Sequence, residues 1–450
     1  MAEAGLRRRS SVLLDAFQTQ LWPLPVVGVT LALVLGVALP VGDARIDDGL
    51  STTSKAYLFG GGPDAARSVL SAVASSLITV TSLTFSLTVV TLQLASSQFS
   101  PRLLRTFSRD RFVHVTLAVF LGTFTYSLLV LRTVRSSAEN QSAVVPQISV
   151  TVAVVLTLAS VIGLVLFLSH LATQIRVETI LDKVHGEATD TLRRVLDSRG
   201  DGPRPADQAP APPSRAVPLV IAESGFMVSV EEDELLEAAT EAGAIVVIEG
   251  SPGGSLVADT PLGQTWTVDG HDLTAEARAR LGRRVGAAVH AGPERTSAQD
   301  IAYGLRQLTD VTNKALSPGI NDPTTAVHAL GHIAGVLCEA VAFELGPKLL
   351  HDRQGRVRVV LKRPDFGDLL DGAISDPRRY GSDSPLVLER LAQLLRQVGW
   401  CVHDPREQQA VREQQHRLQE TITKAQFGPE ESVRLTTAVT QIDDALADRW

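Results

Sequence analysis

The chain has 450 residues, a formal net charge of -7 and 44% hydrophobic residues, a length that allows about two to four domains. The acidic balance excludes nucleic acid as an expected partner, because no concentrated basic surface appears outside short loops. The two cysteines, Cys338 and Cys401, predict no disulfide framework and fit a reducing cytoplasm.

Four runs with few or no charges lie before residue 175 and predict four transmembrane helices. They cover residues 21–41, 68–94, 112–131 and 147–170. Each run is long enough to cross a hydrocarbon core about 30 Å thick. The arginines at 7–9 precede the first run as in a signal peptide, but the run is too long for a cleaved signal and lacks a clean cleavage site. We therefore expect an uncleaved first span.

Basic residues near the ends of the runs predict how the chain is oriented. Arginines cluster before the first run, between the second and third, and after the fourth, whereas the basic residues of 42–67 share their loop with aspartates. The positive-inside rule then places the N- and C-termini in the cytoplasm. We expect a multi-pass protein of the bacterial cytoplasmic (inner) membrane, with the lipid bilayer as a partner.

A polar stripe follows the second run, within the uncharged stretch from Ser68 to Pro101. Thr81, Thr84, Thr88 and Thr91 step by three, four and three, so their hydroxyls share one face of a helix. Small hydroxyl residues in a span either pack against another helix, at about 0.6 kcal/mol each, or line a pore or wet cavity. Both interpretations remain open at this point, and pore lining is the hypothesis for these four residues.

Acidic and basic residues are absent from the interiors of all four runs. That absence counts against a proton-coupled transporter or pump, which usually needs carboxylates within the membrane. The segment at 100–111 reads SPRLLRTFSRDR and predicts a short helix with Arg102, Arg105 and Arg109 on one face. These arginines are candidates for contact with anionic lipid, or for an electropositive pore mouth that attracts anions.

The remaining chain is expected to form a cytoplasmic α+β region, so the fold class is a membrane α-helical domain of four transmembrane helices followed by that region. The phrase SPGGSLVADTPLGQ resembles the turn-strand-turn pattern of the barrel-sandwich modules of lipoyl and biotinyl carriers. Those carriers need a modifiable lysine, and residues 217–270 contain none, so we expect a small β-rich barrel-sandwich-like module for assembly or contact. The predicted boundaries are a transmembrane domain at 1–175, a membrane-exit helix at 176–196 that continues the fourth span, a Pro-rich linker at 197–216, the β-rich module at 217–275 and a helical cytoplasmic domain at 276–450.

A polar phrase in the helical domain predicts a helix at 298–316, a break at 317–319 and a second helix that Asp322 caps. Capping and packing explain every residue in it. The functional alternative is a cytoplasmic polar pocket for an ion or anion, which would use the helix N-terminus. Its candidate residues are Arg306, Asp310, Asn321 and Asp322.

His328 and His332 are four residues apart, a spacing that metal sites use, but the intervening sequence is ordinary core sequence without the glutamate of zinc proteases. We therefore expect structural histidines and no metal site. The chain has no phosphate loop, nucleophile elbow or nucleotide fingerprint, so no enzyme activity and no cofactor is predicted. Four later helices are expected at Phe366–Ala373, Pro385–Val398, Pro405–Gln426 and Pro429–Leu446.

Two long phrases point to a family. TSLTFSLTVVTLQLASSQFSPRLLRTFSRDR at 81–111 and YGLRQLTDVTNKALSPGINDPTTAV at 303–327 resemble the bacterial predicted membrane proteins of the domain of unknown function 2254 family. The resemblance covers residues 15 to 445. It implies an integral membrane protein with a large cytoplasmic portion, and it implies no particular activity, ligand or catalytic residue.

Two functions follow as expectations. The first is a homo-oligomeric ion channel or passive conduit for a small ion, lined by the four threonines, with a cytoplasmic domain for assembly or gating. The alternative is a membrane-anchored sensor or scaffold whose cytoplasmic domain binds a ligand or partner.

Overall fold

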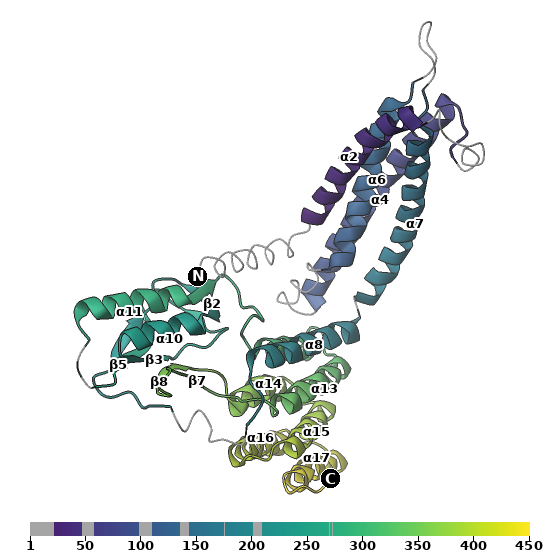
Figure 1. Cartoon of the computed structure of the whole chain (residues 1–450). Coiled ribbons are helices and arrows are strands. Elements are labelled where there is room, and N and C mark those ends of the chain that lie inside the picture. Colours follow the sequence, from purple (N-terminus) through teal and green to yellow (C-terminus); the bar gives the residue numbers. More distant parts are fainter. Residues whose placement is uncertain are drawn as a thin grey trace. The chain divides into compact units, whose positions relative to one another are not determined.

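The computed structural model describes residues 22–46, 58–98, 110–135, 144–174, 176–200, 209–269, 271 and 273–450. The described chain forms two compact units, Met1–Arg176 and Val177–Trp450 (Figure 1). Within each unit, segments that are far apart in the sequence pack against one another.

The first unit contains four long apolar helices, at the four places where the sequence predicts membrane spans. The helices are α2 (Pro23–Ile46), α4 (Pro63–Gln98), α6 (Arg111–Thr133) and α7 (Gln147–Gln174), each long and apolar enough to cross a membrane. Large apolar side chains such as Leu31, Phe85 and Leu158 are exposed on the outside of this unit. In a bilayer that exposed apolar surface meets lipid chains rather than water.

Small residues allow α2 and α6 to pack closely. A Cβ atom at Gly28 would lie 2.8 Å from the Ala118 carbonyl oxygen, and one at Gly122 would lie 3.3 Å from the Gly28 carbonyl oxygen. A Cβ at Gly36 would meet the Leu129 side chain at 2.8 Å. Spans associate by such close backbone approach, because lipid provides no hydrophobic drive between helices.

The second unit begins with α8 (Val177–Val195), which is separate from α7. The predicted continuation of the fourth span is therefore interrupted, since α7 ends at Gln174 and α8 begins at Val177. Helix α8 buries Leu181 and Leu192 within the second unit. It packs against helices α12 and α13, which are described below.

Two open sheets follow in the second unit. The five-stranded sheet has the order β1 (Val217–Val220), β5 (Pro261–Thr267), β3 (Ala244–Ile248), β8 (Val357–Leu361) and β7 (Lys348–His351). Only the β3–β8 pairing in it is parallel. The second sheet is antiparallel, with the order β4 (Ser255–Leu256), β2 (Gly225–Val230) and β6 (Val289–Gly292).

The structure does not support the predicted barrel-sandwich-like module, because neither sheet formed by the described residues closes on itself. Strand β8 lies beside β3, with Ile248 opposite Leu361, and β7 then forms an open edge of the sheet. Strands β7 and β8 come from a segment that was expected to be helical. The pairing of β8 with β3 depends on residues far away in the chain, and local sequence pattern does not contain that information.

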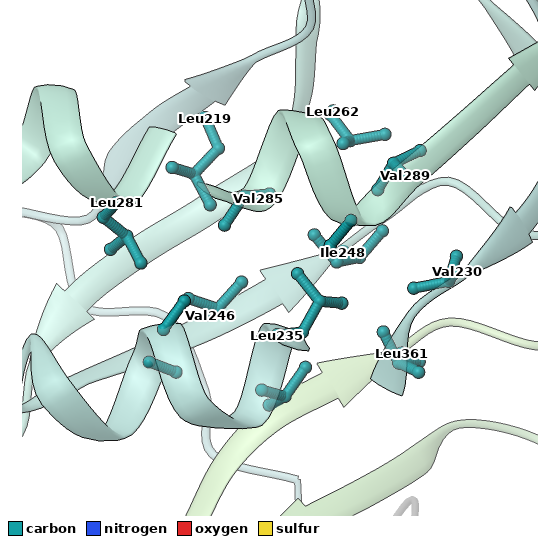
Figure 2. Close-up of a cluster of buried hydrophobic side chains, with 14 of the residues drawn as sticks. Leu219, Val230, Leu235, Val246, Ile248, Leu262, Leu281, Val285, Val289 and Leu361 are labelled. Atoms are coloured by element: carbon teal, nitrogen blue, oxygen red, sulfur yellow. The ribbon is translucent and has the colours of Figure 1, made fainter. Parts of the chain in front are cut away.

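The hydrophobic core of this region lies between the sheets and two helices, α10 (Glu232–Glu241) and α11 (Ala275–Ala288). Figure 2 shows Leu235 of α10 and Val285 of α11 close to Val246 and Ile248 of β3. In β3, buried residues alternate with half-buried ones, as expected when one strand face covers a core. Burying each of these large side chains contributes roughly 1.5–3 kcal/mol.

The rest of the second unit is a set of packed helices. They are α12 (Tyr303–Ala315), α13 (Pro323–Ala340), α14 (Phe366–Tyr380), α15 (Pro385–Cys401), α16 (Pro405–Lys424) and α17 (Pro429–Ala445). Pro385, Pro405 and Pro429 stand at the helix starts that the sequence predicted, where a missing N–H costs nothing.

Candidate functional site

The four threonines of α4 lie on its packed face. Their residues are 8%, 0%, 7% and 7% exposed in chain order, from Thr81 to Thr91. Each hydroxyl donates a hydrogen bond of 2.7–2.8 Å to the carbonyl oxygen four residues earlier. Nearer the start of α4, buried aliphatic residues precede them, namely Ala66, Leu70, Val73, Ala74 and Leu77.

Helix packing accounts for every one of these observations. Helix α4 packs against α6 and α7, and the threonine hydroxyls are satisfied by their own helix without water. Side chains that are buried in this way do not line a water-filled path within one chain. Pore lining by Thr81, Thr84, Thr88 and Thr91 stays a prediction, and it would need the helices to separate.

Hydroxyl groups also occupy the inner faces of α6 and α7. The Ser160 hydroxyl of α7 donates to the Thr123 hydroxyl of α6 at 3.2 Å. Other buried hydroxyl residues on these helices are Thr116, Ser127 and Ser149. The interior of the first unit is therefore rich in hydroxyls, as in spans held together by close packing and interhelical hydrogen bonds.

A carboxylate from α2 holds the start of α7. Asp43 accepts hydrogen bonds from the Ser149 N–H at 2.8 Å and hydroxyl at 2.7 Å, and from the Ile148 N–H at 3.2 Å. The Tyr126 hydroxyl of α6 donates to the Ser149 carbonyl oxygen at 3.0 Å. Negative charge is favourable at a helix N-terminus, where free N–H groups and the helix dipole both attract it.

A second carboxylate connects the start of α6 to the end of α7. One oxygen of Asp110 accepts from the Phe112 N–H at 2.9 Å, and the other lies 2.5 Å from Nε2 of His170. The rings of Phe112 and His170 are 4.6 Å apart. His170 is thus the partner of a carboxylate that caps a helix.

The predicted lipid- or anion-contacting residues Arg102, Arg105 and Arg109 lie outside the described residues. Their role stays a prediction.

Two members of the predicted polar pocket form an ion pair in α12. Nε of Arg306 lies 3.2 Å from a carboxylate oxygen of Asp310, and its Nη1 lies 3.5 Å from Asp376 of α14. Arg306 therefore links α12 to α14. Such partly exposed pairs contribute at most about 1 kcal/mol.

The other two members form the start of α13. Asp322 accepts from the Thr325 N–H at 3.1 Å and hydroxyl at 2.6 Å, which confirms the predicted N-cap. The hydrogen bond from the Thr325 side chain is the main reason why the pKa of Asp322 is lowered. Asn321 has a φ of 51°, a left-handed conformation that asparagine tolerates. An ion pair, a helix cap and a left-handed turn residue describe these four positions, and the binding pocket stays a prediction.

The two predicted structural histidines of α13 face α8. Nδ1 of His328 lies 3.8 Å from Glu178, Nε2 of His332 lies 4.0 Å from Asp182, and the His332 ring centre is 5.3 Å from that of His185. Burial, followed by the neighbouring His185, lowers the pKa of His332. In the part of the chain that the structure describes, no group of three or more His, Cys, Asp or Glu residues could hold a metal ion.

A cavity of about 400 Å³ opens between α13 and α15. Small residues of α13 form one wall, and the polar and aromatic side chains come from α15 and the end of the chain. The lining residues with recognisable chemistry are Cys338, Arg390, Trp400, Cys401 and Trp450. Pockets of this size that combine apolar walls with a few polar groups are the usual sites for small molecules.

Arg390 and two tryptophans set the character of this cavity. The Trp400 and Trp450 rings meet edge to face with centres 5.6 Å apart, and the Arg396 guanidinium lies 4.2 Å from the centre of the Trp450 ring. Nη1 of Arg390 donates to Gln397 at 3.2 Å, and burial lowers the pKa of Arg390. A guanidinium beside flat aromatic faces suits a ligand with an aromatic ring and a negative charge.

Sequence reasoning identified neither the cavity nor the two carboxylate caps. Asp43 and Asp110 do flank predicted spans, and that position was a usable signal for capping. The sequence showed only that the chain contains two cysteines. No local pattern indicates that Cys338 and Cys401, which belong to two different helices, line the same cavity.

Comparisons with known proteins find similar sequences among predicted membrane proteins and uncharacterized proteins. A family model described as "Predicted membrane protein (DUF2254)" matches residues 18–397. An uncharacterized protein of Mycobacterium bovis is 36% identical over 422 residues, which cover 92% of this chain and 78% of the relative. An uncharacterized protein of Mycobacterium tuberculosis shows the same identity and coverage. No solved structure matches the chain.

Proposed function

Because the chain belongs to the DUF2254 family of predicted membrane proteins, we propose that its four apolar helices anchor a cytoplasmic module, residues 177–450, that binds a ligand or partner. The family assignment confirms the resemblance of the phrases at 81–111 and 303–327. In this proposal the chain is a sensor or scaffold and not an enzyme. The bacterial inner membrane and a cytoplasmic position for both termini belong to the proposal, and the placement of basic residues supports them.

The burial of the α4 threonines is the observation that most supports an anchor. A conduit along α4 needs hydroxyls that face water, whereas these hydroxyls bond to their own helix and are covered by the same chain. Large apolar side chains are exposed on all four helices, as lipid contact requires, and α4 also exposes the hydroxyl residues Ser75, Thr79, Ser82 and Ser86. An anchor explains the buried threonines and the exposed apolar side chains.

The cavity between α13 and α15 is the proposed ligand site of the module. Its ligand is a small molecule with an aromatic ring and a negative charge, which Trp400 and Arg390 would contact. Arg390 is buried enough that a charge-assisted hydrogen bond to it is worth more than one at the surface.

Tryptophan fluorescence of the full chain in lipid nanodiscs, titrated with naphthalene sulfonate, tests this site. We expect saturable quenching that weakens at least about tenfold in Arg390→Gln, because the ligand loses its charged partner. Arg353→Gln, at an exposed arginine on the β7–β8 turn, serves as the matched control and should bind as the wild type does. Unsaturable quenching, or equal binding by all three proteins, would rule out this ligand site.

A homo-oligomeric ion channel is the second candidate, favoured by the hydroxyl-rich interior shared by α4, α6 and α7. Movement of these helices apart would expose hydroxyls to a small ion. Liposomes with reconstituted protein test it: channel activity requires ion flux that falls in Thr84→Leu and Thr88→Leu. The anchor proposal expects no flux from any of these proteins.

A further inference from the structure

The two cysteines of the chain are neighbours in space. Cys338 lies near the end of α13, Cys401 is the last residue of α15, and both thiols are free and line the cavity between these helices. Cys401 is near enough to Cys338 to contribute to the electrostatic environment of its thiol. Sγ of Cys338 also lies 3.7 Å from the Gln397 carbonyl oxygen. Both cysteines of this 450-residue chain therefore line the same cavity.

The surroundings of Cys338 disfavour its thiolate. Burial, together with the neighbouring Cys401, raises the pKa of the Cys338 thiol, so its thiolate is disfavoured. Cys338 is therefore the less suitable thiol for a first attack. Arg390 in the same cavity carries a positive charge that attracts anionic reagents. A cavity of about 400 Å³ is large enough to admit a small reagent.

We propose that Cys338 and Cys401 form a reversible dithiol–disulfide pair, which low-molecular-weight disulfides oxidise through the cavity. The Cys401 thiolate attacks one sulfur of the small disulfide, which forms a mixed disulfide and releases the first small thiolate. Cys338 then loses its proton to solvent and attacks Sγ of Cys401, which releases the second small thiolate. The protein loses two electrons and two protons, and the small disulfide is reduced to two thiols.

The bond would connect the ends of α13 and α15 next to Trp400. It closes a loop from residue 338 to residue 401, which restricts the unfolded chain, and we expect the melting temperature to rise by about 5–10 °C. It also changes the wall of the cavity. The proposal does not depend on whether the cavity binds a ligand, because oxidation is read directly from the thiols.

The test uses the full chain in lipid nanodiscs with oxidised glutathione, followed by intact mass under non-reducing conditions. We expect the wild type to lose two hydrogen atoms, keep no glutathione, remain a single covalent chain and return to its starting mass with dithiothreitol. Cys338→Ser and Cys401→Ser should each trap one glutathione, and Cys338→Ser should react faster because it retains the attacking thiol.

The wild-type measurement decides the outcome even if a serine variant folds poorly. The proposed dithiol–disulfide pair is overturned if the wild type retains glutathione or if two chains become covalently linked. It is also overturned if the folded protein does not react under conditions in which the urea-unfolded chain does. Proteolysis without reductant should yield one peptide pair that contains Cys338 and Cys401. Cys338→Ala and Cys401→Ala repeat the trapping measurement without a polar substitute.

Discussion

Asp43, near the end of α2, receives hydrogen bonds from both the backbone N–H and the hydroxyl of Ser149 in the first turn of α7. The contact joins two helices that lie far apart in the sequence. It satisfies N–H groups that a helix start leaves free, at a place where lipid chains cannot satisfy them. The spans are therefore held by a specific polar contact as well as by apolar packing.

Asp43→Ala should lower the free energy of unfolding of the membrane unit by about 1–3 kcal/mol, because the N–H groups of α7 lose their acceptor. Thermal unfolding in detergent measures the change. Ser76→Ala, where the exposed hydroxyl bonds only to its own helix, is the control and should change little. Equal melting of the two variants would contradict the role of Asp43.

Gly28→Ala should destabilise the contact between α2 and α6 by about 1–3 kcal/mol, because the new methyl group would meet the Ala118 backbone at 2.8 Å. Gly42→Ala is the matched control on the same helix, since a Cβ there meets nothing within 4 Å. The comparison is made by thermal unfolding in one detergent. If Gly42→Ala proves the more harmful change, the close crossing at Gly28 is not important.

Thr84→Val should change the stability of the membrane unit by no more than about 0.6 kcal/mol, since it keeps the shape and removes a hydroxyl that bonds only to its own helix. Thr84→Leu should cost about 1–3 kcal/mol, because Thr84 is fully buried and the larger side chain overpacks the site. Detergent melting curves of both variants provide the measurement. Tolerance of leucine would show that Thr84 faces open space.

Acidification should weaken the packing of α8 on α13 through His332. Its pKa is lowered in the folded protein, so between that pKa and the unfolded value near 6.5 the unfolded state binds more protons. Stability therefore rises with pH through this window and falls on acidification. The neighbouring histidines His185 and His328 oppose protonation of His332. The carboxylate of Asp182 on α8 favours protonation of His332.

Melting temperatures between pH 8 and pH 5 check this prediction. We expect His332→Gln to flatten the decline below about pH 6.5, whereas His416→Gln, at an exposed histidine of α16, should leave it unchanged. A decline of the same size in the His332 variant would assign the pH dependence to other groups.

Some parts of this architecture follow from local sequence. The four spans and the helix starts at Asp322, Pro385 and Pro405 were predicted, because hydrophobic length and capping depend on residues next to one another. The grouping of Thr81, Thr84, Thr88 and Thr91 on one face followed from helical period alone.

Tertiary structure decided the rest. What the threonines face, which strand lies beside β3 and which thiol lies near Cys401 all depend on residues distant in the chain. The periodicity of a helix places side chains on a face but does not say whether water, lipid or another helix covers it. By itself the sequence determined a four-span membrane protein of a recognisable family; only the folded chain buried its hydroxyls, left its sheets open and brought its two cysteines together, because packing joins segments that no local pattern connects.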